Sequence, residues 1–318
     1  MSLLYLIYIS LLITITLSSP KVPIIAIYSN PLPDNSEFYT ADYVNSNPIR
    51  WLESSGAGVV VIHAWHTTDE IDEILTKVNG VFFQGGSKDL SLTNIWEKNA
   101  KHILYKAIKM NKDGDYFPIL GICQGFELLH ALIAGTVDVL SQFDSYNVAS
   151  PLILSNEFDS SKMFAGITDD ERQMLKEENI APQFHHRGIK LDAYIDMPEL
   201  DLFFKVSTYA RDVNGHIFVN TVEGRDYPIY ATQHHPEKVN FERHYASIPN
   251  SLGSTLHSQR IAQFFVNEAK KNKNVMEMDD LIKYDYIDTM INVKKIYYFQ
   301  NATPVRGENS GESLFLAS

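Results

Sequence analysis

The chain has 318 residues, of which 45% are hydrophobic and 21% charged, and its formal net charge is −12. This hydrophobic content supplies a packed core and excludes wholesale disorder. Because the balance is acidic and no basic stripe stands out, nucleic acid is not expected as a partner. A chain of this length can hold one large α/β domain or two smaller domains.

The N-terminus predicts entry into the secretory pathway. Residues 1–19 carry no charged side chain and are almost wholly apolar from Leu3 to Leu17. Because the small residues Ser18 and Ser19 follow, we interpret residues 1–19 as a cleaved signal peptide. The stretch is short for a membrane span, and an uncleaved anchor is the alternative. No later stretch is long and apolar enough to cross a bilayer, so no membrane association is expected after cleavage.

Cys123 is the only cysteine, so no intramolecular disulfide can form. In an oxidising compartment a lone thiol is a liability unless it is buried or chemically used. The segment from Asn301 to Thr303 is a glycosylation sequon, weakened by the Pro304 that follows it.

Apolar runs alternate with helical patterns along the first part of the chain. The runs predict buried strands at residues 22–28, 59–63, 80–84 and 117–122. Helices are expected at residues 41–54, with Pro48 as a break, at 69–78 and around 100–108. The alternation weakens between about residues 146 and 212. It resumes with strands at 217–222 and 229–232 and a helix at 258–270.

This alternation predicts βαβ units, and therefore an α/β fold with a mostly parallel central sheet and helices on both faces. We expect a single domain over residues 20–274, with an irregular insertion where the alternation weakens. The tail at residues 275–318 mixes acidic, aromatic and Gly/Ser segments, and its structure is not indicated.

The sharpest motif is GICQG at residues 121–125, between a predicted strand and a predicted helix. A nucleophile between two glycines at such a junction is typical of an elbow, in which a tight turn exposes the side chain to substrate. The junction also places the sulfur of Cys123 at a helix N-terminus, where the dipole favours the thiolate. The alternative is a buried structural cysteine beside turn glycines.

A candidate base lies in QHHPE at residues 233–237, after a predicted strand. A thiol needs a base that takes its proton and later returns it to the leaving group. Residues two apart in extended chain point the same way, so Glu237 can accept a hydrogen bond from His235 and fix its tautomer. His234 should face the opposite side. Side chains of neighbouring residues in a strand point apart, and no set of possible ligands has the spacing of a metal site, so no metal is expected. The alternative to a catalytic role for this segment is a polar loop that follows the strand.

Two further motifs are weaker. In QGGSKD at residues 84–89, a Gly-Gly turn ends a predicted strand, and its N–H groups could form an oxyanion hole with the N–H of Gln124. A plain turn is the default interpretation. In FHHR at residues 184–187, the residue chemistry fits a polar loop as well as a substrate contact.

Together these segments resemble the class I glutamine amidotransferase superfamily, whose sites combine a GxCxG elbow with a later HPE. Within it, the chain most closely resembles the γ-glutamyl hydrolase family, the folate polyglutamate hydrolases. The closer match rests on short stretches that follow one another from about residue 22 to residue 271. They include WLESSGA at 51–57, QGGSKDL at 84–90, DGDYFP at 113–118, GFE at 125–127, QHHPEK at 233–238 and FFVNEA at 264–269.

The resemblance implies a cysteine hydrolase that cuts γ-glutamyl bonds of folate poly-γ-glutamates through a thioester, with no metal or organic cofactor. It implies Cys123 as nucleophile, His235 as base and Glu237 as support for the base. Gly86 and Gln124 would supply the oxyanion N–H groups. The resemblance also implies a location in the lysosome, vacuole or extracellular space. It further implies that the protein can form a homodimer.

The resemblance further implies residues that contact the substrate. These are His185, Gly85 and Glu127. Two positions depart from the family pattern: His234 stands where the family usually has tryptophan, and His186 stands where a basic residue is common.

Two alternative functions keep the same fold. A glutaminase-type amidotransferase subunit would release ammonia for a synthetase, but the predicted signal peptide and the absence of a second catalytic domain argue against it. A catalytically inactive binding protein is the other alternative, and the intact Cys, His and Glu set argues against that one.

Overall fold

The computed structural model describes residues 22–32, 41–242, 244–284 and 296–300. The predicted signal peptide at residues 1–19 and the sequon at Asn301 lie outside these residues. A ten-stranded sheet contains a parallel run in the order β4-β1-β5-β6-β12. Its strands are β1 (Ile24–Tyr28), β4 (Gly58–Ile62), β5 (Gly80–Phe83), β6 (Ile119–Ile122) and β12 (Ile229–Thr232).

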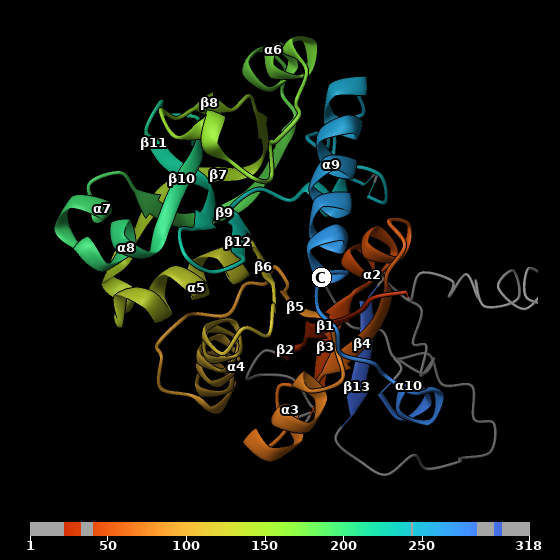
Figure 1. The fold of residues 1–318 in the computed structure, drawn as a ribbon. Helices are drawn as coiled ribbons and strands as arrows, with labels where there is room; N and C mark the ends of the chain where they lie inside the picture. The colour runs from red at the N-terminus through yellow and green to blue at the C-terminus, as the bar shows by residue number, and fades with distance from the viewer. Residues whose placement is uncertain (1–21, 33–40, 243, 285–295, 301–318) are drawn as a thin grey trace, which may run out of the picture.

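The parallel strands are buried on both faces, which explains their nearly continuous apolar sequences. In β1, Ala26 and Tyr28 belong to one core, whereas Ile25 and Ile27 belong to the other. The helices over the first core are α3 (Thr68–Leu75), α4 (Ile95–Lys112) and α5 (Gln124–Ala134), and those over the second are α2 (Ser46–Glu53) and α9 (Leu252–Ala269) (Figure 1). The predicted fold class is therefore confirmed.

Antiparallel strands extend the sheet beyond β12, where we predicted an irregular insertion. Their bounds are β7 (Leu140–Ser150), β8 (Ile153–Leu154), β9 (Ala181–Lys190), β10 (Phe204–Arg211) and β11 (Ile217–Gly224). β11 pairs with β12, β10 and β9, and β9 pairs with β7. The prediction of an irregular segment at residues 146–212 is therefore wrong. Most positions of β7 are exposed or half-buried, so its sequence contains no apolar run.

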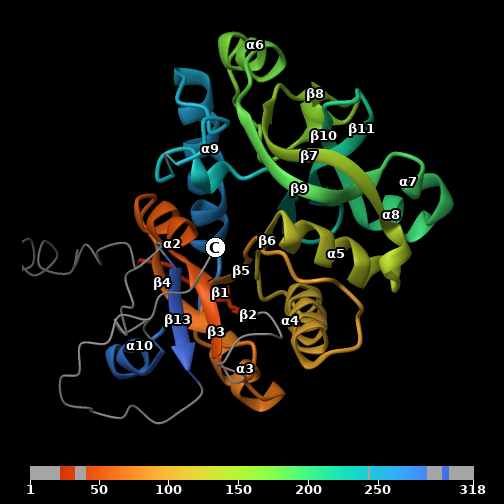
Figure 2. The same ribbon diagram turned by 180° about the vertical axis from the view of Figure 1, so that it is seen from behind.

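Short helices connect these antiparallel strands. They are α6 (Asp169–Glu177), α7 (Ala193–Asp196) and α8 (Pro198–Phe203), with a single turn at η2 (Phe158–Ser160). Another single turn, η1 (Val137–Val139), leads from α5 into β7. Figure 2 shows the antiparallel strands and these helices gathered on one side of the molecule, away from β3 and β4.

A small second sheet, in the order β13-β3-β2, contains β2 (Asn30–Pro31), β3 (Ala41–Asn45) and β13 (Ile296–Gln300). The helix predicted at residues 41–54 is therefore wrong for its first part, and only Ser46–Glu53 is helical. β3 forms because β2 and β13 pair with it, and local spacing does not reveal such partners. The tail, for which the sequence indicated no structure, contributes β13 and α10 (Met278–Tyr284).

The other predicted elements are present with shifted ends. The helix predicted at residues 258–270 begins earlier, at Leu252, and the helix predicted at 69–78 ends at Leu75. Within the described residues, no helix combines the length and the apolar character that a membrane span requires.

Candidate active site

The carboxyl ends of β5, β6 and β12 meet at one edge of the sheet, because these strands are parallel neighbours. Ligands of open α/β sheets bind at this kind of edge. Gly85 follows β5, Cys123 directly follows β6, and His235 follows β12. A cleft of about 210 Å³ opens there, and these three residues and Glu237 are part of its lining.

Cys123 occupies a sharp turn between β6 and α5. Its backbone has φ 53° and ψ −107°, a conformation that is strained for a residue with a side chain. Its N–H donates to the carbonyl of Thr232 at 2.8 Å, which fixes the turn against β12. A β-carbon at Gly125 would overlap the backbone of Phe83, so glycine is needed for α5 to begin this close to β5. The turn has the geometry predicted for an elbow.

His235 and Glu237 form a buried pair. Nδ1 of His235 lies 2.6 Å from Oε1 of Glu237. Because the carboxylate accepts, Nδ1 carries the proton and Nε2 keeps its lone pair. The predicted hydrogen bond is present, but the chain there is a 3-10 turn, η3 (Pro236–Lys238), rather than an extended segment.

Gly85 lies between the cysteine and the histidine. A β-carbon at Gly85 would lie 2.7 Å from Cε1 of His235 and 3.4 Å from Cβ of Cys123. Asn30 donates from Nδ2 to the carbonyl of Gly85 at 2.9 Å and holds this turn in place. Any side chain at residue 85 would therefore displace His235 from the cysteine.

Burial dominates the electrostatics of the thiol. Desolvation raises the pKa of the Cys123 thiol well above its ordinary value, and the Glu127 and Glu237 carboxylates raise it further. The N–H of Gln124 donates to the sulfur and lowers the pKa. The N–H at the start of α5 acts in the direction expected of a helix terminus, but burial outweighs it. A base has to take the proton during attack.

The structure brings together the two residues predicted for the oxyanion hole. A β-carbon at Gly86 would overlap the side-chain amide of Gln124. That amide donates to the carbonyl of Lys88, so it holds the loop after β5 against the start of α5. The backbone N–H of Gln124 is left beside the sulfur of Cys123, where a developing oxyanion would form.

His185 is buried and is not among the described residues that line the cleft. Its Nδ1 donates to the carbonyl of Arg187 at 2.6 Å, and its Nε2 lies 3.2 Å from Oε1 of Gln183. Burial lowers the pKa of His185 to about 3. Successive side chains of a strand point to opposite faces, so the ring lies on the other face of β9 from Phe184, which does line the cleft. This geometry does not support direct substrate contact by His185.

Glu127 is also buried and outside the described cleft lining. Its N–H donates to the carbonyl of Cys123 at 2.9 Å, and its Oε1 accepts from Nε2 of Gln233 at 3.2 Å. Burial raises the pKa of Glu127 to about 7, and the charge of Arg187 opposes that rise. Glu127 is therefore a group that titrates close to the thiol near neutral pH rather than a surface for substrate.

Several cleft residues were not singled out from the sequence as site residues. Lys238 belongs to the QHHPEK stretch, and its ammonium lies 5.2 Å from the ring centre of Phe184. The remaining ones are Tyr43 and Asn45 on β3, Tyr146 on β7, and Asn47, Ser87 and Tyr245 outside these two strands. Prediction of β3 and β7 as strands would have been the signal that places Tyr43, Asn45 and Tyr146.

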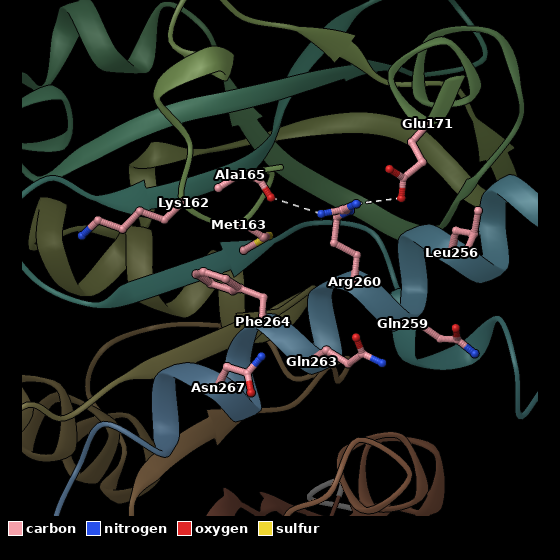
Figure 3. A pocket seen from close by; sticks show the side chains of 10 residues that line it. All are labelled: Lys162, Met163, Ala165, Glu171, Leu256, Gln259, Arg260, Gln263, Phe264 and Asn267. Carbon is pink, nitrogen blue, oxygen red and sulfur yellow. Dashed lines mark hydrogen bonds and ion pairs between the residues drawn. The ribbon is translucent and has the colours of Figure 1, made fainter. Parts of the chain in front are cut away.

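A second hollow, of about 330 Å³, lies between α9 and the segment before α6 (Figure 3). Across it, Arg260 donates to Glu171 at 2.7 Å and to the carbonyl of Ala165 at 3.3 Å. Its lining within the described chain has no cysteine or histidine, so it offers no nucleophile with a base. The described residues also contain no group of three or more His, Cys, Asp or Glu side chains placed to hold a metal ion.

Comparison with known proteins identifies the family of this chain. The family model described as Peptidase C26 matches residues 23–237. The chain belongs to the peptidase C26 family. γ-Glutamyl hydrolase B of Dictyostelium discoideum is 30% identical over 89% of this chain and 84% of that protein. γ-Glutamyl hydrolase of Homo sapiens is 34% identical over 74% of each.

The predicted resemblance and the hydrolase class are thereby confirmed for this C26 peptidase. The matched region runs to Glu237 and so contains the elbow, the Gly-Gly turn and the His-Pro-Glu turn. Among solved structures, a chain of PurLQS from Thermotoga maritima matches with a TM-score of 0.46 and 16% identity, over 78% of this chain and 99% of that chain.

Proposed function

We propose that this C26 peptidase hydrolyses γ-glutamyl bonds of folate poly-γ-glutamates, with Cys123 as nucleophile, His235 as base and Glu237 as its orienting partner. The observation that carries the proposal is the buried hydrogen bond between His235 and Glu237 in the cleft that also contains Cys123. The names of the relatives, γ-glutamyl hydrolases, support the choice of bond.

Acylation begins when Nε2 of His235 takes the proton of the Cys123 thiol. The sulfur forms a bond to the γ-carbonyl carbon, and the carbonyl oxygen gains negative charge beside the N–H groups of Gln124 and Gly86. The carbon–nitrogen bond then breaks, and His235 gives its proton to the leaving amine. Glu237 stabilises the imidazolium that exists between these two transfers.

Deacylation repeats the same proton path with water. His235 takes a proton from a water molecule, and the hydroxide attacks the thioester carbon. The carbon–sulfur bond breaks, and His235 returns the proton to the sulfur of Cys123. The products are a free γ-carboxylate and the regenerated thiol.

A cation in the cleft favours binding of the substrate, because each glutamate in the tail carries an α-carboxylate. Lys238 is the one lysine or arginine among the described residues that line the cleft. We assign the α-carboxylate of the γ-glutamyl residue to Lys238. A local cation matters here because the net charge of −12 repels a polyanionic tail at long range.

The decisive experiment is a product assay on a folate pentaglutamate, with Cys123→Ala alongside the unsubstituted protein. We expect glutamate or γ-glutamyl peptides from the unsubstituted protein alone. Hydrolysis of free glutamine without cleavage of the pentaglutamate would favour the glutaminase alternative. If the unsubstituted protein cleaved neither the pentaglutamate nor free glutamine, the catalytically inactive binding protein would be favoured.

Location and assembly are further proposals. The charge-free, largely apolar residues 1–19 support a signal peptide and delivery to the extracellular space, lysosome or vacuole. N-terminal sequencing of protein secreted from a eukaryotic host tests this, and a mature chain that still begins at Met1 would contradict it. A homodimer is tested by the mass of the purified protein in solution.

A further inference from the structure

One side of the cleft is aromatic. Tyr146, Phe184 and Tyr245 line it, and we call them the aromatic wall. The ring of Phe184 packs edge-on against Tyr146 at 5.9 Å and against Tyr245 at 5.1 Å. Tyr146 and Tyr245 are nevertheless 49% and 41% exposed. The wall therefore presents two aromatic rings to whatever occupies the cleft.

The backbone holds the wall in place. Tyr146 and Phe184 are direct partners across β7 and β9, and the register shifts immediately after Tyr146. Such irregularities re-aim side chains. Asn147, at the shift, has a φ of 57°, and its Oδ1 accepts from Ser247 at 2.5 Å. That bond fixes the segment of Tyr245 to β7, so the two exposed rings are positioned by one connected structure.

The aromatic wall begins beside the proposed catalytic base. The ring of Phe184 lies 5.8 Å from the ring of His235 at an interplanar angle of 78°, so the base itself touches the wall. On its outer side, Tyr146 is backed by His186, stacked at 5.0 Å and 12°. An aromatic group bound to the wall would therefore lie in the same cleft as Cys123 and His235.

We propose that the aromatic wall binds the aryl group of an aryl-γ-glutamyl substrate, and that it directs cleavage to the bond next to the aryl-bearing glutamate. The proposal deepens the proposed function and rests on it. Aromatic rings attract each other at centroid separations of about 4.5–7 Å. The benzoyl ring of a benzoylglutamate lies about 7 Å from its own γ-carbonyl, given ordinary bond lengths. Because Cys123 and the three wall residues line one cleft, a carbonyl at Cys123 leaves the ring of the same substrate on the side of the wall.

The test compares two dipeptides that differ only in the group on the first glutamate, 4-aminobenzoyl-Glu-γ-Glu and acetyl-Glu-γ-Glu. We expect kcat/KM of the unsubstituted protein to be roughly 5- to 10-fold higher for the aryl substrate, as a stacked pair contributes. Tyr146→Ala and Tyr245→Ala should each bring the ratio of the two kcat/KM values toward one, mainly by raising KM for the aryl substrate. Tyr146→Phe should keep the ratio, because the ring is retained.

The matched control is Tyr105→Ala, since Tyr105 is a 48% exposed tyrosine on α4 that is outside the cleft lining. It should leave the ratio as it is. On 4-aminobenzoyl-triglutamate, the first product released should be the γ-linked diglutamate. Equal kcat/KM for the two dipeptides, or release of single terminal glutamates first, would overturn the aromatic wall proposal. Failure of the unsubstituted protein to cleave either dipeptide would overturn the proposed function instead.

Discussion

At the residue scale, the site depends on where two protons are held, one on the thiol of Cys123 and one on Nδ1 of His235. Burial raises the pKa of the Cys123 thiol, so the sulfur is protonated until a base acts. The hydrogen bond from Nδ1 of His235 to Glu237 keeps Nε2 available as that base. Glu237 is therefore a positioning residue for His235, whereas Cys123 forms bonds to the substrate.

Replacing these residues should have graded effects on turnover. We expect Cys123→Ala to abolish hydrolysis of the pentaglutamate and to leave folding and substrate binding largely intact. Glu237→Gln should cause a loss roughly 100-fold smaller, because an amide still orients the ring in part. Steady-state kcat and circular dichroism of both proteins check this. A Glu237→Gln protein as inactive as Cys123→Ala would mean that Glu237 takes part in bond formation.

Glu127 offers a separate test of the thiol. Desolvation is the largest cause of the raised pKa of Cys123, and the charge of Glu127 is the next. The pKa of Glu127 itself is raised to about 7, so this charge is present only above neutral pH. In Glu127→Gln, the alkylation of Cys123 by iodoacetamide should therefore be faster above pH 7 and unchanged well below it.

The control for this test is Glu199→Gln, because Glu199 is exposed on α8. Its alkylation profile should overlay that of the unsubstituted protein. If Glu127→Gln also overlays it at every pH, then Glu127 does not act on the thiol, and its proximity is only structural.

At the scale of elements, the features that could be predicted from the sequence are those set by the spacing of residues close together in the chain. The elbow at Cys123 and the hydrogen bond between His235 and Glu237 depend on residues close together in the chain, and both were predicted, although the chain at Glu237 is a 3-10 turn and not extended. β3 was predicted as helix because its strand character comes from β2 and from β13, which lies more than two hundred residues away. The roles of Tyr146 and Phe184 as cleft residues depend on the pairing of β7 with β9, which no local pattern specifies.

Helix α9 is tied to the strand end that carries the base. His234 is fully buried, and its Nδ1 lies 2.8 Å from Oδ1 of Asn220. Its Nε2 lies 2.8 Å from Nε2 of His257 on α9. With Nδ1–H donating to Asn220, Nε2 of His234 accepts from His257. Nearby, Ser258 donates to the carbonyl of Pro236 at 2.7 Å, so two bonds hold the His-Pro-Glu turn against the helix.

Loss of this anchor should affect both stability and turnover. His257→Leu leaves Nε2 of His234 buried without a donor, which costs about 1–3 kcal/mol of unfolding free energy. Because His235 follows His234 directly, we also expect a lower kcat from poorer orientation of the base. Urea unfolding and kcat measure the two effects. The control is Gln259→Ala, on the exposed side of the same helix, which should change neither the unfolding free energy nor kcat. If His257→Leu also changed neither quantity, the anchoring role would be contradicted.

At the scale of the whole molecule, buried histidines govern the response to acid. Desolvation lowers the pKa of His66 and His130 to about 4 and the pKa of His185 and His257 to about 3. The unfolded chain takes up these protons below about pH 6.5, whereas the folded chain does not. Their contribution to stability is therefore complete above pH 6.5 and is lost as the pH falls toward 4. Glu127, with its pKa raised, acts in the opposite direction between about pH 7 and 4.5, but it is one group against four.

The unfolding free energy should therefore fall between pH 7 and pH 5, by about 2 kcal/mol for each such histidine. His130 is the suitable residue to test, because Nδ1 donates to the carbonyl of Phe126 at 2.9 Å and Nε2 accepts from the hydroxyl of Tyr194 at 2.9 Å. His130→Gln destabilises the protein at every pH, so the quantity to compare is the difference between pH 7 and pH 5 in urea unfolding. We expect that difference to be smaller by about 2 kcal/mol in His130→Gln. An unchanged difference would mean that His130 takes up a proton inside the folded protein. The loss of unfolding free energy in acid would then have to come from other groups, and the protein would lose less stability at pH 5 than we predict.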